Sequence, residues 1–164
     1  MSAEPLIQIL GKMLLLHKSL NQLAKQKTEI LKTGDTDALN NLLKEEKKHI
    51  QAIQKFEAER QRASEEFLVK FEQSDERMST ITECINFANQ TEKQKLDYLK
   101  LELQAQIKAL KVQNELNQQL IKQSLQFVNL SLDLLMPEID TYNYERPGQA
   151  YQFNDGRSIF NSKA

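Results

Sequence analysis

The sequence contains few of the residues that interrupt helices. Its 164 residues include four glycines, three prolines and no tryptophan, and aromatic residues make up 7% of the chain. So little glycine and proline favours long, uninterrupted helices over a β fold with many turns. The length is sufficient for one domain with a modest core, and the small aromatic content suits a helical bundle with narrow apolar seams.

Net charge of either sign is also nearly absent. Lysine and arginine total 22 against 23 aspartates and glutamates, a formal net charge of -1. This balance gives no electrostatic attraction toward nucleic acid or anionic lipid, and we expect no nucleic-acid partner. Cys84 is the only cysteine, so an intramolecular disulfide is excluded. A small buried side chain in a reducing compartment is favoured over a catalytic thiol.

A long apolar run is missing from the N-terminal stretch MSAEPLIQILGKMLLLHKSL. Glu4, Lys12 and His17 interrupt it. The stretch also lacks a basic start followed by an apolar segment, so we predict neither a signal peptide nor insertion into a membrane. We expect a cytoplasmic protein.

Two long helices are predicted in the first half of the chain. Apolar residues at alternating three- and four-residue spacings predict a helix over about residues 4–32, broken only at Lys27. A second helix is predicted over about residues 37–71, with a seam interrupted at Glu46 and Arg60.

The connection between these helices carries its own signals. Gly34 can adopt the left-handed conformation that ends a helix, and Asp35 and Thr36 offer side-chain oxygens that can cap the next one. A connection this short requires the two helices to form an antiparallel hairpin.

The second half is predicted to form a short helix and one long helix. Ser74-Asp75 can cap a crossover helix over about residues 76–88, and Thr91 with Gln94 forms a capping-box pattern that opens a helix over about residues 92–136. That helix would be roughly 65 Å long at the standard rise.

The predicted fold class is therefore all-α. We expect an elongated antiparallel three-helix bundle or coiled-coil hairpin, with a short crossover helix and a flexible C-terminal tail. The helical domain would span residues 1–136 and the tail residues 137–164, where glycine and proline concentrate and no helical period is present.

The long third helix has one apolar face that runs along its whole length and is predicted to pack on the first two helices. It consists of Leu96, Leu99, Leu103, Ile107, Leu110, Asn114, Asn117, Ile121, Leu125, Val128, Leu132 and Leu135. Asparagines in an apolar seam cost stability but can fix the register when they are hydrogen-bonded. A register role for Asn114 and Asn117 is favoured over contact with a ligand.

A second apolar face is present only in the C-terminal half of this helix. It consists of Val112, Leu116, Leu120, Phe127, Leu130 and Leu134. A three-helix bundle uses one face of each helix, so this face is not needed for the fold. It could be covered by the chain's own tail, by the crossover or by a second copy in a homodimer, or it could bind an amphipathic helix of another protein.

The sequence shows no constellation for catalysis. Glu46 and His49 have the Glu-x-x-His spacing of half a di-iron site, but the second half is missing, and a solvated charged face explains the segment better. No nucleophile motif, phosphate-binding glycine loop or Cys/His cluster is present. We therefore predict no enzyme, no metal and no cofactor.

Several stretches together resemble the FlgN family of flagellar type III export chaperones. The most specific is NELNQQLIKQSLQF, in which Asn114 and Asn117 precede an apolar run that ends at Pro137. The hairpin sequence with its Leu-Lys-x-Gly-Asp turn at residues 31–35 is similar to the family's N-terminal part. Tyr144 followed by Gly148-Gln149 resembles the family's short tail element.

The resemblance implies a chaperone for the hook-filament junction proteins FlgK and FlgL. Such a protein binds the C-terminal helical segment of its cargo, prevents premature assembly or aggregation, and delivers the cargo to the flagellar export gate and ATPase components. A non-catalytic coiled-coil scaffold or regulator of the export apparatus is the alternative function.

The resemblance also assigns candidate residues. By position, the cargo-binding residues would be Val112, Leu116, Asn117, Leu120, Gln123, Phe127, Leu130 and Leu134. Tyr144 would contact the export gate, although it could also be an ordinary tail residue or cover the second face. Self-association of the free chaperone into a weak homodimer stays open.

Overall fold

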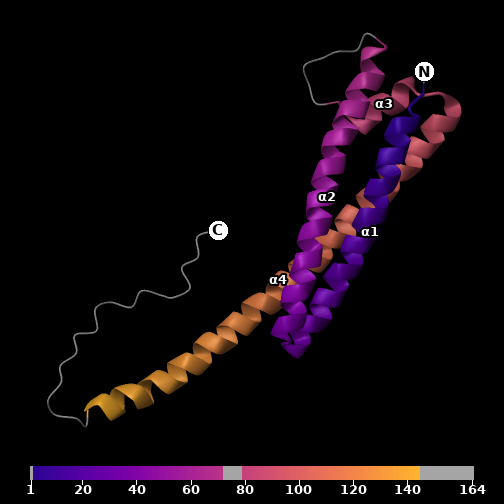
Figure 1. The fold of residues 1–164 in the computed structure, drawn as a ribbon. Coiled ribbons are helices and arrows are strands. Elements are labelled where there is room, and N and C mark those ends of the chain that lie inside the picture. Colours follow the sequence, from indigo (N-terminus) through magenta and orange to yellow (C-terminus); the bar gives the residue numbers. More distant parts are fainter. Residues whose placement is uncertain (1, 72–78, 145–164) are drawn as a thin grey trace. The chain divides into compact units, whose positions relative to one another are not determined.

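The computed structural model describes residues 2–71 and 79–144, with side chains described as far as Leu135. Its four helices are α1 (Glu4–Thr33), α2 (Thr36–Val69), α3 (Ile81–Phe87) and α4 (Gln90–Tyr144) (Figure 1). No strand occurs in these residues. The predicted all-α helical bundle is confirmed, and the helix bounds differ from the predicted ones mainly around α3 and at the end of α4.

The turn between α1 and α2 has the predicted chemistry. Gly34 has a φ of 72° and donates its backbone N–H to the carbonyl of Ile30, so it ends α1 in the left-handed conformation. The Asp35 carboxylate accepts a hydrogen bond from the Ala38 backbone N–H at 2.9 Å and caps α2. The two helices then run antiparallel, as the hairpin prediction requires (Figure 1).

Charged residues that interrupt the apolar seams have charged partners in the structure. Lys27 of α1 and Glu46 of α2 form a partly buried ion pair at 3.0 Å. Arg60 bonds the Glu57 carboxylate at 2.7 Å and reaches the Ser79 carbonyl just before α3. The interruptions therefore connect neighbouring segments, which explains how the seams accommodate them.

The crossover helix begins later than predicted. α3 starts after Thr80, whose hydroxyl accepts from the Glu83 backbone N–H while the Glu83 carboxylate accepts from the Thr80 backbone N–H. This reciprocal capping box satisfies two N–H groups at once, so it sets the start of the helix. The predicted cap at Ser74-Asp75 is not the cap of α3, and those two residues lie outside the described part of the chain.

The start of α4 also differs from the predicted capping box. The Asn89 side chain accepts from the Glu92 backbone N–H at 2.9 Å, so the helix begins at Gln90, ahead of Thr91. The Glu92 carboxylate instead accepts from the Ser2 hydroxyl and the Ala3 backbone N–H. An acidic side chain of α4 therefore caps the N-terminus of α1.

Pairs of hydrogen-bonded residues show that α1 and α4 run in the same direction. Ala3 meets Glu92, Asn21 meets Gln106, and Thr28 meets Asn117, so the contacts advance together along both helices. α4 is consequently antiparallel to α2, and the three long helices alternate in direction.

The apolar core is concentrated at one end of this bundle. Its members come from the first half of α1, the end of α2, α3 and the first turns of α4: Ala3, Leu6, Ile7, Leu10, Met13, Leu14, Phe67, Leu68, Cys84, Ile85, Leu96, Leu99 and Leu103. Cys84 is completely buried there, and burial raises the pKa of its thiol. This supports a packing role for the single cysteine.

Two compact units divide the chain, Met1–Gln123 and Ser124–Ala164. α4 contributes to both units and continues through Pro137 to Tyr144, eight residues past the predicted end at residue 136. Proline is disfavoured inside a helix but does not forbid one, so the sequence rule placed the end too early. The rest of the predicted tail, residues 145–164, lies outside the described residues.

Candidate protein-binding surface

The inward face of α4 is shorter than the sequence predicted. Leu96, Leu99 and Leu103 are buried, but Ile107 is half exposed, and after Leu103 the only buried residue of α4 among those described is Asn117. The prediction of a continuous packed seam to Leu135 is therefore wrong. The α1 residue that bonds Asn117 is Thr28. Because α1 ends soon afterwards at Thr33, few residues of the hairpin remain to cover α4 beyond Asn117.

Asn117 occupies the interface between α1 and α4. It is 2% exposed, its amide donates to the Ala24 carbonyl at 2.9 Å, and its Oδ1 accepts from the Thr28 hydroxyl. Gln113 donates to the same hydroxyl. The predicted register role of Asn117 fits these bonds, whereas its assignment to the cargo-binding surface does not, because its side chain is used inside the bundle.

Asn114 does not share this environment. It is only partly buried, and its side chain has no hydrogen-bonding partner among the described residues. Of the two asparagines predicted to fix the register, the structure gives the bonds to Asn117 alone.

The predicted second face is open within the unit Met1–Gln123. Val112 is 61% exposed, Leu116 is 43% exposed and Gln123 is exposed, while Leu120 is half-buried. Two further apolar side chains of α4, Tyr98 and Leu101, are also exposed. Neither residue was predicted as part of the second face, although both share the helical face of Val112 and Leu116 at 100° per residue.

In the unit Ser124–Ala164, the remaining predicted members are exposed as well. Phe127, Leu130 and Leu134 have 71%, 59% and 69% of their surface exposed. Four residues that had been assigned to the packed seam are also exposed in this unit: Leu125, Val128, Leu132 and Leu135. Apolar side chains thus occupy several sides of this part of α4. The Tyr144 side chain lies outside the described residues, although the helix backbone reaches it.

Exposed apolar groups in this number need an explanation. Monomeric soluble proteins seldom leave so many apolar side chains of one helix uncovered, and such surfaces mark interaction sites. An amphipathic helix that packed on five or six of these side chains would gain on the order of 10 kcal/mol before ordering costs. The arrangement therefore suits binding of a peptide helix.

The polar groups elsewhere do not form a reactive site. No group of three or more His, Cys, Asp or Glu side chains among the described residues could hold a metal ion. His49 lies between the Ser19 hydroxyl and the Glu45 carbonyl, at 2.8 Å from each. These bonds occupy both ring nitrogens, and Glu46, the other half of the Glu-x-x-His spacing, is paired with Lys27.

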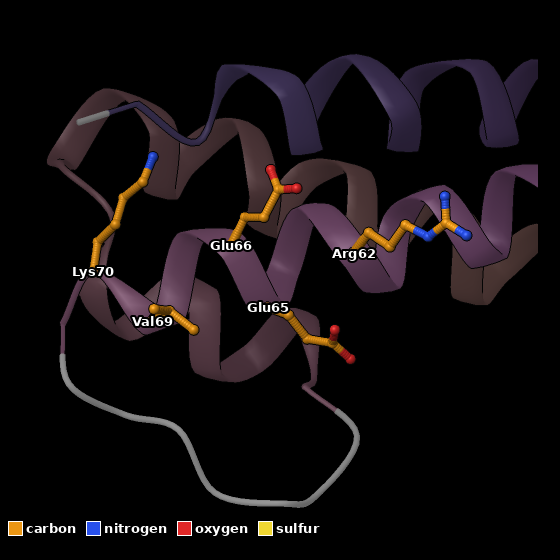
Figure 2. Close-up of a pocket in the computed structure, with 5 residues that line it drawn as sticks. All are labelled: Arg62, Glu65, Glu66, Val69 and Lys70. Carbon is orange, nitrogen blue, oxygen red and sulfur yellow. The ribbon is translucent and has the colours of Figure 1, made fainter.

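A shallow pocket near the end of α2 offers no better candidate. It is lined by Arg62, Glu65, Glu66 and Val69 of α2 and by Lys70, which directly follows this helix (Figure 2). Two cations and two carboxylates on neighbouring turns make a solvated charged surface, and among the described residues no other element lines the pocket. We assign no function to it.

Comparisons with known proteins identify the family. The FlgN family, described as FlgN protein, matches residues 1–152, and the chain belongs to this family of flagellar export chaperones. The chain is also 36% identical to the uncharacterized protein YvyG of Bacillus subtilis strain 168, over the full length of both chains. No solved structure is similar enough to count as a match. Within the described residues, no helix is both long and apolar enough to cross a membrane.

Proposed function

We propose that this protein is a cytoplasmic export chaperone for the hook-filament junction proteins FlgK and FlgL. It binds the C-terminal helical segment of its cargo, prevents premature assembly or aggregation, and delivers the cargo to the flagellar type III export gate. The observation that carries this proposal is the set of exposed apolar side chains on α4 in a chain that belongs to the FlgN family throughout most of its length.

The proposed mechanism is physical and involves no bond chemistry. A free cargo segment with an apolar stripe is prone to aggregation and proteolysis. Packing the stripe against Val112, Leu116, Phe127, Leu130 and Leu134 would bury it and order it as a helix. Release at the export gate requires moderate affinity, so we expect dissociation constants near the micromolar range.

A double substitution tests this surface. Leu116→Asp with Leu130→Asp places charges at two exposed positions of α4, and we expect at least about a hundredfold weaker binding of synthetic C-terminal segments of FlgK and FlgL. Isothermal titration calorimetry measures the affinity. Circular dichroism should show unchanged helicity, because neither side chain belongs to the core.

Leu15 provides the matched control. It is also an exposed leucine, but it lies on α1, outside the proposed surface. Leu15→Asp should bind both segments as the unsubstituted protein does. Full binding by the folded double variant would refute the proposed surface and favour the scaffold or regulator function.

A further inference from the structure

One turn of α4, residues 113–117, connects the interior of the bundle with the proposed binding surface. Gln113 and Asn117 of this turn make hydrogen bonds toward α1, while Val112 and Leu116 are exposed to solvent. We propose that Thr28 of α1 is a positioning residue that fixes this turn and so preorganises Val112 and Leu116 for an amphipathic helix. This inference rests on the proposed function.

Thr28 is the centre of the hydrogen-bond network. Its hydroxyl donates to Asn117 Oδ1 and accepts from Gln113 Nε2, and the Asn117 amide reaches the Ala24 carbonyl one turn earlier on α1. Thr28 is itself buried. Two adjacent turns of α1 therefore hold one turn of α4 at two side chains.

Few apolar side chains are buried at this level, and those of the hairpin are Leu20 and Ala24 of α1 and Leu42 of α2. The core cluster ends at Leu103 on α4 and at Leu14 on α1. In the described part of α4 beyond Leu103, the hydrogen bonds to α1 are those of Asn21 with Gln106 and of the Thr28 network. Since no apolar side chain of α4 is buried between Ile107 and Leu116, these hydrogen bonds contribute a substantial part of the attachment of residues 106–117 to α1.

Losing the Thr28 hydroxyl would leave Asn117 buried without one of its partners. A buried polar group without a hydrogen bond is costly, and the helix can relieve that cost by separating from α1 so that water reaches the amide. The backbone that carries Val112 and Leu116 would then fluctuate, and a partner would have to order it on binding. Binding would weaken although no residue that the partner touches has changed.

The position of Thr28 makes the test specific. Thr28 is buried on α1, facing away from the proposed surface, so a partner helix on Val112 and Leu116 has no access to it. Thr28→Val keeps the branched shape and removes the hydroxyl, whereas Thr28→Ser keeps the hydroxyl. Asn114→Ala is a second control, because this half-buried neighbour has no side-chain bond among the described residues.

Two measurements on the full chain follow the effect. Hydrogen exchange should become faster in Thr28→Val at amides 106–117 and stay unchanged at amides 94–103, which belong to the core end. Titration with the C-terminal FlgK segment should show roughly three- to tenfold weaker binding, from the added ordering cost. Thr28→Ser and Asn114→Ala should stay within about twofold of the unsubstituted protein in this titration.

The outcomes separate the two proposals. Unchanged exchange and affinity in Thr28→Val, or an equal loss in Thr28→Ser, would overturn the positioning role. If the unsubstituted protein does not bind the segment, the proposed function fails, while the exchange data still decide whether Thr28 orders this turn. If Thr28→Val does not fold, Gln113→Ala, which removes only the outer hydrogen bond, must show the same pattern to a smaller degree.

Discussion

Glu92 shows how one side chain can serve two helix N-termini. It lies in the first turn of α4, and its carboxylate also accepts from Ser2 and Ala3 at the start of α1. The hydrogen bond from the Ser2 hydroxyl is the main cause that lowers the pKa of Glu92, with the backbone N–H groups adding to it. Because the folded pKa is below the ordinary value, this carboxylate stabilises the fold above that value, and the contribution is lost as the pH falls through the folded pKa.

His17 gives a pH dependence at milder acidity. It is buried in α1, its Nδ1 has no hydrogen-bonding partner among the described residues, and burial lowers its pKa. The unfolded chain therefore takes up the proton at a higher pH than the folded chain. The full stability is present above the ordinary histidine pKa of about 6.5 and decreases as the pH falls toward the lower folded value.

Replacing His17 tests this assignment. In His17→Leu, the free energy of unfolding should change less between pH 7 and about pH 5 than in the unsubstituted protein, because the titrating group is gone. Urea unfolding at several pH values measures this free energy. An unchanged slope in His17→Leu would assign the effect to another group.

At the scale of the helices, the two described glycines have opposite roles. Gly34 ends α1 with a φ of 72°, a conformation that costs an alanine about 1–2 kcal/mol, so Gly34→Ala should destabilise the fold by about that amount. Gly11 lies inside α1, and an added Cβ there would meet no atom within 4 Å.

Gly11→Ala should therefore stabilise the fold by up to about 1 kcal/mol, since alanine is the better helix former. Thermal and urea unfolding measure the stability of Gly34→Ala and Gly11→Ala. Two shifts in the same direction would contradict the assigned conformations, because the substitution is the same and only the backbone differs.

The sequence allowed prediction of the elements whose signals are local. The left-handed Gly34 and the Asp35 cap depend on neighbouring residues, and both are confirmed. The start of α4 was missed because Asn89 and Thr91 both offer an oxygen, and the choice depends on Glu92 being drawn toward α1. Likewise, Lys27 and Glu46 each interrupt the apolar seam of a different helix in the sequence. Only the packed hairpin shows that they form an ion pair.

For the candidate surface, the lengths of the helices were more informative than the spacing of their apolar residues. The seam of α4 continues in the sequence to Leu135, but α1 and α2 have 30 and 34 residues against 55 for α4. Two shorter helices cannot cover a longer one throughout, so part of the predicted core face had to stay exposed. The period shows which residues share a face, whereas burial depends on what lies opposite.

A chaperone with the proposed function must both hold its cargo and transfer it, and we propose that different parts of α4 perform these tasks. The apolar side chains between Val112 and Leu134 are proposed to bind cargo, whereas Tyr144 at the end of α4 is proposed to contact the export gate. If the tasks are separate, a change at Tyr144 should affect delivery without affecting affinity. The FlgK segment should bind Tyr144→Ala as tightly as the unsubstituted protein, within about twofold.

Delivery in cells should nevertheless fail in this variant. We expect FlgK and FlgL secretion to fall by about tenfold or more, as an aromatic anchor at a protein interface commonly contributes at least 1.4 kcal/mol. Tyr142→Ala controls for the loss of an aromatic residue on the same turn and should secrete normally. Immunoblots of culture supernatants and cell pellets provide the measurement. Weaker cargo binding by Tyr144→Ala would instead place this residue in the cargo surface, and normal secretion would remove it from the export step.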